Sequence, residues 1–221
     1  MDENLLSEYQ GEIIKAFGHK SRTLLNGITG PVQIIRSLSD EPQLIEPLRI
    51  LELSVSRFEK FSTRVALVLD LLQNRWKTKL KPLELNDIIR YIILDLSDYI
   101  DFFKVEVTVN DGGSPVEILS DYYLLNNLLH IMLELSISLS NQNSTILVDI
   151  NNTSSSKEVL LTCNDNGLLQ KSLKPVLDKS HDPTGLDIDV YLLKLCSGIL
   201  NYHLDFFTNT AEMSTIKLQI T

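Results

Sequence analysis

The stretch AFGHKSRTLLNGITGPVQIIRS, residues 16–37, predicts a long amphipathic helix, and the rest of the chain is interpreted from it. His19 lies off the apolar stripe of this helix, so we expect its imidazole to face water. An imidazole nitrogen is nucleophilic near neutral pH, so a water-facing histidine can take part in group transfer. The stripe has the three- and four-residue steps of one helix face and consists of Ile13, Phe17, Leu24, Leu25, Ile28, Pro31, Ile35 and Leu38.

The ten residues from His19 to Ile28 resemble the phosphoacceptor box of sensor histidine kinases, which is usually close to H-E-L-R-T-P-L-N-x-I. The positions that match are His19, Arg22, Thr23, Leu25, Asn26 and Ile28, and those that depart are Lys20, Ser21 and Leu24. The resemblance implies that His19 is the phosphoacceptor and that Thr23 stands where the family places a residue that aligns a hydrolytic water. Lys20 stands where the family usually has Glu or Asp, which orients the imidazole and takes a proton. A charged lysine cannot do that; it can instead attract a phosphoryl group, or mark a histidine that no longer reacts.

Composition and charge narrow the classes of partner. The chain has 221 residues and a formal net charge of -9, which argues against nucleic acid as the main partner because phosphate backbones require clustered Lys and Arg. The sequence shows no signal-like N-terminal run and no apolar stretch of bilayer length, so we expect a cytoplasmic protein without a membrane span. Cys163 and Cys196 are isolated in sequence and are expected to be reduced core thiols.

Residues 1–79 are predicted to form a helical hairpin that dimerises. A break at Asp40-Glu41-Pro42 precedes a second periodic segment, and two helices joined by a short turn pack antiparallel. One hairpin cannot cover both apolar stripes, so two chains are expected to pair as a homodimer into a four-helix bundle. The second stripe follows a heptad alternation interrupted at Ser62 and consists of Leu44, Leu48, Leu51, Val55, Phe58, Val65, Leu69, Leu72 and Trp76.

Counting outward from the turn places His19 near the level of Ser62 and Arg64, assuming about 1.5 Å of rise per residue. A small polar residue at this level can leave room beside a phosphorylated ring, and Arg64 or Arg22 can screen its charge. The alternative is that Arg64 is an ordinary surface residue and Ser62 a tolerated one.

Residues 80–221 are predicted to form an α/β sandwich, in which one mixed sheet is covered by helices. Asn86 and Asp121 are expected to cap two helices, and Asp111-Gly112-Gly113 is expected to form a turn. Helices are expected after Asn86, from Asp121 to about Ser140, and from about Leu186 to Ile199. Strands are expected at 83–85, 105–109, 115–119, 145–150, 158–163, 204–207 and 215–220.

This order of elements resembles the ATP-binding domain of histidine kinases, but the nucleotide motifs are altered. Counting from Asp121, the two asparagines of the family's metal-binding helix are replaced by Ile131 and Leu135, which cannot ligate Mg²⁺. The D-x-G-x-G motif keeps Asp165, which in the family recognises adenine, and Gly167, whereas Leu169 replaces the second glycine. The later G-x-G-L motif keeps Gly185 but has Asp187, whose charge would repel phosphates. The intervening lid, about Leu168 to Thr184, is short. The changes together imply that ATP binding and autophosphorylation are lost.

A histidine bundle on such a degenerate domain resembles the histidine phosphotransferases that derive from two-component sensor histidine kinases. The resemblance implies that His19 relays a phosphoryl group between response-regulator receiver domains, one of which can belong to a hybrid histidine kinase. The chain would need no cofactor or metal of its own, because the receivers supply Mg²⁺. The expected docking face runs along Asn26, Gly27, Gly30 and Ile34. The alternatives are an inactive pseudokinase that docks or sequesters a receiver, and a phosphatase of that receiver; an active kinase is the least expected function.

Overall fold

The computed structural model describes residues 3–37, 44–153, 156–165, 187–210 and 213–220. By its contacts the chain divides into two units, Met1–Trp76 with His181–Asp189 and Lys77–Ser180 with Val190–Thr221. Each unit is described by itself. Among the described residues, no helix combines the length and the apolar character needed to cross a bilayer.

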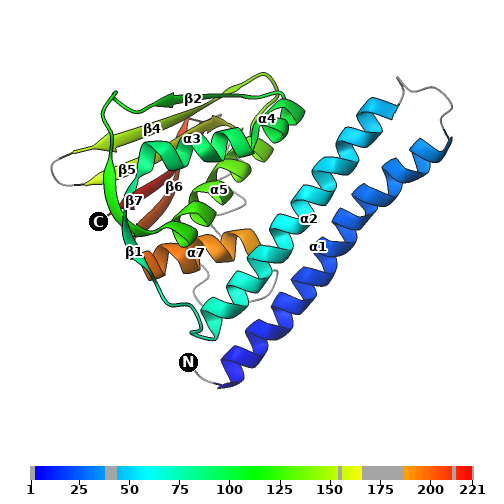
Figure 1. Cartoon of the computed structure of the whole chain (residues 1–221), viewed down its shortest axis with the longest axis horizontal. Coiled ribbons are helices and arrows are strands. Elements are labelled where there is room, and N and C mark those ends of the chain that lie inside the picture. Colours follow the sequence, from blue (N-terminus) through cyan, green and yellow to red (C-terminus); the bar gives the residue numbers. More distant parts are fainter. Residues whose placement is uncertain (1–2, 38–43, 154–155, 166–186, 211–212, 221) are drawn as a thin grey trace. The chain divides into compact units, whose positions relative to one another are not determined.

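The first unit is an antiparallel helical hairpin of α1 (Glu3–Ser37) and α2 (Ile45–Leu72). The rings of Phe17 and Phe61 stack with centroids 5.7 Å apart, and a Cβ placed on Gly27 would lie 2.7 Å from Ser54 Oγ. These two contacts set the register between the helices, and the second shows that α1 and α2 approach closely at Gly27. Figure 1 shows the two helices running side by side. The hairpin predicted from the two apolar stripes is therefore present, with Pro31 inside α1.

The second unit contains a five-stranded mixed sheet in the order β2-β4-β5-β7-β6. Its strands are β2 (Glu106–Asn110), β4 (Thr145–Asn152), β5 (Lys157–Asn164), β6 (His203–Thr210) and β7 (Met213–Ile220). The pair β2 and β4 is parallel, and every other neighbouring pair in this order is antiparallel. The mixed sheet is the one that the sequence predicts.

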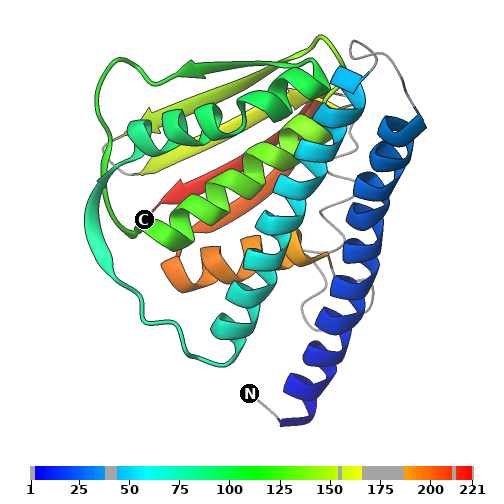
Figure 2. The same ribbon diagram turned by 45° about the vertical axis from the view of Figure 1, so that its right-hand side comes forward.

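Helices cover one face of this sheet, as Figure 2 shows. They are α3 (Leu85–Asp95), α4 (Ser97–Phe103), α5 (Tyr122–Leu139) and α7 (Ile188–Leu200). The core lies between α5, whose Leu124, Leu128 and Ile131 are fully buried, and alternate strand residues such as Val148 and Ile216. The helix-on-sheet layering is thus the expected α/β sandwich.

Two details of this unit differ from the sequence-based expectation. The strand predicted at 115–119 does not join the main sheet: β3 (Glu117–Asp121) pairs antiparallel with β1 (Leu80–Glu84) in a separate two-stranded ribbon. The sequence does not predict the helix α4, because its seven residues are too few to show a periodic pattern.

The two predicted caps have different outcomes. Asp121 caps α5 as expected, because its carboxylate accepts hydrogen bonds from the backbone N–H groups of Tyr123 and Leu124. The prediction for Asn86 is wrong, since α3 begins at Leu85 and no side chain in the described part of the chain caps it. The Asn86 amide instead accepts from Val116 N–H at 2.8 Å and donates to the Ser114 carbonyl at 3.3 Å. It therefore ties the first turn of α3 to the segment that leads into β3.

Candidate functional site

The predicted phosphoacceptor box lies in the middle of α1. Of His19 and Arg22 the structure describes the backbone within the helix but not the side chains. The Phe17–Phe61 stack places this turn of α1 opposite the turn of α2 that contains Ser62 and Arg64. That is the level given by counting outward from the connection between the helices.

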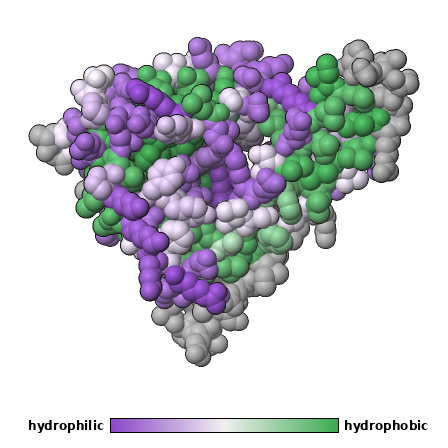
Figure 3. All heavy atoms as spheres, viewed as in Figure 1, coloured by the Kyte–Doolittle hydropathy of each residue, from purple (hydrophilic) through white to green (hydrophobic). Residues whose placement is uncertain are grey.

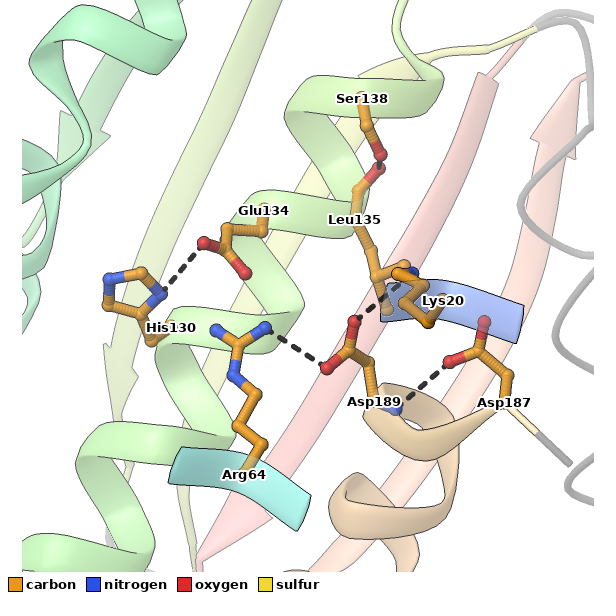
Figure 4. Close-up of polar contacts among 8 residues, drawn as sticks. All are labelled: Lys20, Arg64, His130, Glu134, Leu135, Ser138, Asp187 and Asp189. Atoms are coloured by element: carbon orange, nitrogen blue, oxygen red, sulfur yellow. Dashed lines mark hydrogen bonds and ion pairs between the residues drawn. The ribbon is translucent and has the colours of Figure 1, made fainter. Parts of the chain in front are cut away.

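A three-residue ion cluster lies at this level and includes one residue that sequence reasoning missed. Asp189, at the start of α7, belongs by its contacts to the hairpin unit. Its Oδ1 lies 3.1 Å from the Arg64 guanidinium, and its Oδ2 lies 3.9 Å from Lys20 Nζ. Figure 4 shows the carboxylate between the two cations. Asp189 therefore joins both helices of the hairpin through their positive charges.

Burial differs strongly within this cluster. The side chains of Arg64, Asp189 and Lys20 are 7%, 17% and 37% exposed. A guanidinium buried this far needs a counter-charge, because removing a charge from water is costly unless it is paired. The Arg64–Asp189 pair is therefore the stronger of the two, and the exposed Lys20 contact is worth less.

The hydroxyl of Ser62 is used within its own helix. Ser62 Oγ donates a hydrogen bond of 2.8 Å to the Phe58 carbonyl, four residues earlier, a bond that lets a half-buried serine satisfy its polar group inside a helix. Ser62 thus breaks the apolar seam of α2 without leaving an unsatisfied hydroxyl.

The four residues of the predicted docking face are not equivalent. Asn26 and Ile34 are exposed, Ile34 by 48%. A Cβ placed on Gly30 would meet no described atom within 4 Å, whereas a Cβ placed on Gly27 would lie against Ser54 on α2. The structure thus gives Gly27 a packing role between the helices and leaves Asn26, Gly30 and Ile34 accessible from outside the hairpin. Thr23 is also exposed.

The start of α7 is closed by a carboxylate. Asp187 Oδ1 accepts a hydrogen bond of 2.9 Å from the Asp189 backbone N–H, so its negative charge sits on the first turn of the helix. A helix N-terminus is otherwise a favourable place for a phosphate, since its free N–H groups and its dipole attract anions. At α7 the carboxylate of Asp187 occupies that place.

The described residues of the predicted nucleotide motifs in the second unit are apolar or buried. Ile131 is fully buried and Leu135 is half-buried in α5, and Asp165, at the end of β5, is fully buried. Gly167, Leu169, Gly185 and the lid from Leu168 to Thr184 lie outside the described residues. Within the described ranges, no group of three His, Cys, Asp or Glu side chains is arranged to hold a metal ion.

A histidine of the second unit has acidic partners. His130 on α5 is buried, with Nε2 2.9 Å from Asp95 Oδ2 on α3 and Nδ1 3.5 Å from Glu134 Oε1 one turn further along α5. These contacts tie α3 to α5 and give His130 a structural role.

Asp189 could not be found from the sequence. An Asp-x-Asp pair at the start of a helix indicates capping and a favourable dipole interaction. The contact with Arg64 spans 125 positions of the chain, and no local pattern encodes a pairing at that separation.

Comparisons with known proteins find structures of similar fold, whereas the comparisons of sequence find no match. No protein-family model matches the chain, and no curated protein matches it. Among solved structures, the Acinetobacter baumannii histidine kinase AdeS is similar with a TM-score of 0.63 and 12% identity, covering 92% of this chain and 97% of that one. The histidine kinase ThkA, in a complex with the response regulator protein TrrA, gives 0.60 and 16%, covering 95% and 61%. The cytoplasmic segment of histidine kinase QseC gives 0.57 and 11%, covering 73% and 94%. The chain therefore has the fold of histidine kinase cytoplasmic regions.

Proposed function

We propose that this chain is a histidine phosphotransferase of two-component signalling, which passes a phosphoryl group between receiver aspartates through His19 and does not use ATP. The observation that carries the proposal is the His19 box on α1 of a fold shared with histidine kinases over nearly the whole chain. The phosphoacceptor half of that fold is kept, whereas positions that would serve a nucleotide hold Ile131 and Asp187.

The transfer consists of two displacements at phosphorus. A lone pair of a neutral His19 ring nitrogen attacks the phosphorus of a receiver aspartyl phosphate, the N–P bond forms, and the acyl P–O bond breaks to release the aspartate carboxylate. In the second step a carboxylate oxygen of another receiver attacks phosphorus, and the N–P bond breaks to return the imidazole. The receivers supply Mg²⁺, so this chain needs to contribute only the nucleophile and nearby positive charge.

The residues around His19 have distinct roles in this proposal. Lys20, Arg22 and Arg64 offset the charge of the phosphoryl group. Asn26, Gly30 and Ile34 form the accessible face on which a receiver docks, and Gly27 holds that face at a fixed distance from α2. One of the similar structures is a histidine kinase in complex with a response regulator protein, which supports a receiver as the partner.

Pairing of two hairpins into a four-helix bundle completes the proposal. Apart from the docking face, large apolar side chains remain exposed on the hairpin at Leu25, Ile45, Leu48 and Val55. In Figure 3 apolar residues gather on the hairpin over the N-terminal half of α2. A second copy of the hairpin would bury such side chains.

The decisive experiment is transfer from radiolabelled phospho-receivers of the same genome. We expect acid-labile label on the wild type, none on His19→Ala, and normal labelling of His203→Ala, which removes an exposed histidine at the start of β6. Binding of receivers without label on the wild type would contradict transfer and leave the docking pseudokinase. Label from Mg-ATP alone would contradict the ATP-independent route.

Exposure of Thr23 favours one second candidate, a receiver phosphatase, since an exposed hydroxyl one turn after His19 can align a water on a docked receiver. A phosphatase would remove receiver phosphate without label on His19, and Thr23→Ala would abolish that loss. A phosphotransferase would instead keep its label in Thr23→Ala.

A further inference from the structure

The charges near His19 differ from those in the phosphoacceptor box of sensor histidine kinases. Lys20 and Arg64 place two positive charges at the level of His19. Sensor histidine kinases, whose phosphoacceptor box residues 19–28 resemble, usually have Glu or Asp directly after the histidine. The structure supplies the missing negative charge from the start of α7, where Asp189 contacts both cations. The counter-charge thus comes from a residue far away in sequence.

The geometry of this contact resembles the way in which Lys and Arg hold a phosphoryl group. One carboxylate oxygen faces the Arg64 guanidinium at 3.1 Å and the other faces Lys20 Nζ at 3.9 Å. A phosphoryl group presents the same kind of acceptor oxygens with more negative charge, and Arg and Lys are the usual residues that bind it. Asp189 therefore occupies a cation pair that suits phosphate.

We propose that Lys20 and Arg64 form a phosphoryl-binding pair that Asp189 occupies as a resident counter-ion, so that Asp189 and a phosphoryl group on His19 compete for the same two cations. The involvement of His19 rests on the proposed function. The cation pair and its occupant rest on the ion contacts alone.

The competition lowers the stability of phosphohistidine. By this proposal a phosphoryl group on His19 displaces Asp189 from at least part of the pair, which makes phosphohistidine less stable than it would be if no carboxylate occupied the pair. The site then favours passing the group on over holding it. Asp189→Asn keeps an oxygen that can accept from Arg64 but removes the charge, so it should strengthen phosphate binding and raise the occupancy of phosphohistidine. Loss of a structural contact would lower that occupancy, so the sign separates the two roles.

The first test uses inorganic phosphate and the full-length chain, and it needs no phosphotransfer. Phosphate is added stepwise while backbone amide NMR shifts are followed in residues 17–24 and 61–67. We expect Asp189→Asn to bind phosphate on the order of fivefold more tightly than the wild type, the size of one typical net hydrogen bond, because the competing Asp189 contact to Lys20 is long and partly exposed. Asp189→Glu should behave as the wild type.

Asp187→Asn is the matched control, because it removes the same charge two residues away and asparagine caps a helix as well as aspartate does. An equal gain in Asp187→Asn would assign the effect to net charge and overturn the proposal. So would phosphate binding by Asp189→Asn that is no tighter than that of the wild type.

The second test measures the transfer equilibrium between a phospho-receiver and His19. The equilibrium constant for transfer onto Asp189→Asn should be on the order of fivefold larger than that for the wild type, for the same reason, and that for Asp187→Asn should equal the wild-type value. If no variant takes label but phosphate still binds Asp189→Asn more tightly, phosphotransfer fails and the counter-ion role stands. If label passes normally and Asp189→Asn shows no gain in either test, the counter-ion role fails and phosphotransfer stands.

Discussion

At the scale of single residues, the two cysteines are protected by their surroundings. Both are free and buried, and burial raises the pKa of each thiol to about 12, with the charge of Asp165 adding to the effect at Cys163 and that of Asp121 at Cys196. Thiolate is the reactive form, so we expect iodoacetamide at about pH 8 to modify neither cysteine in the native chain and both in urea. Mass spectrometry of the labelled chain measures this, and rapid native labelling of either thiol would contradict it.

Because the folded-state pKa of both thiols is raised, their stabilising contribution is present below the unfolded-state pKa and is lost as the pH rises toward 12.

Residue-level prediction from the sequence succeeds where a side chain acts on its own neighbours. Asp121 is identifiable as a cap because its partners lie two and three positions away. Asn86 is assigned the wrong role because its partners, Ser114 and Val116, are brought to it by the tertiary fold. Asp189 is missed for the same physical reason. Local hydrogen bonding is encoded in spacing, whereas long-range pairing is fixed only when the elements pack.

At the scale of elements, the approach of α1 to α2 at Gly27 can be tested with alanine. In a helix interior, Gly→Ala is worth about 1 kcal/mol of stability, but at Gly27 the new Cβ would lie 2.7 Å from Ser54 Oγ. We expect Gly27→Ala alone to lose this gain, and Gly27→Ala in a Ser54→Ala background to recover it. Gly30→Ala is the control, since its Cβ meets no described atom within 4 Å and should stabilise by the full amount. Urea denaturation followed by circular dichroism gives these values, and full stabilisation by Gly27→Ala alone would contradict the close approach.

The predicted elements agree with the structure where the pattern is long. The stripes of α1 and α2 and the apolar run of α5 each extend over several turns, so their periodicity stands out from chance. The short helix α4 and the pairing of β1 with β3 escape prediction. A strand's sequence indicates that it pairs but not with which partner, because the partner is fixed only when the elements pack.

At the scale of the whole molecule, the hairpin predicts a dimer that a single substitution should break. Leu48 on α2 is 42% exposed in the single chain, and a charge there would have to be buried in a four-helix bundle. We expect the wild type to have twice the 25.1 kDa chain mass in light scattering and Leu48→Glu to have the mass of one chain. Leu94→Glu on α3, where the side chain is 69% exposed in the second unit, should leave the dimer intact. A wild-type mass of one chain at micromolar concentration would contradict the bundle.

The position of β7 in the sheet affects how the chain is made. β7 is the last strand of the sheet in chain order, yet it lies in the interior between β5 and β6 and contributes the buried Ile216 and Leu218. Until residue 220 has left the ribosome, both neighbours keep an open edge of unpaired backbone groups, and the sheet cannot close strand by strand as it emerges. The nascent chain therefore passes through a stage with two unpaired strand edges that can hydrogen-bond to another chain. At this stage binding by a chaperone competes with mispairing between chains.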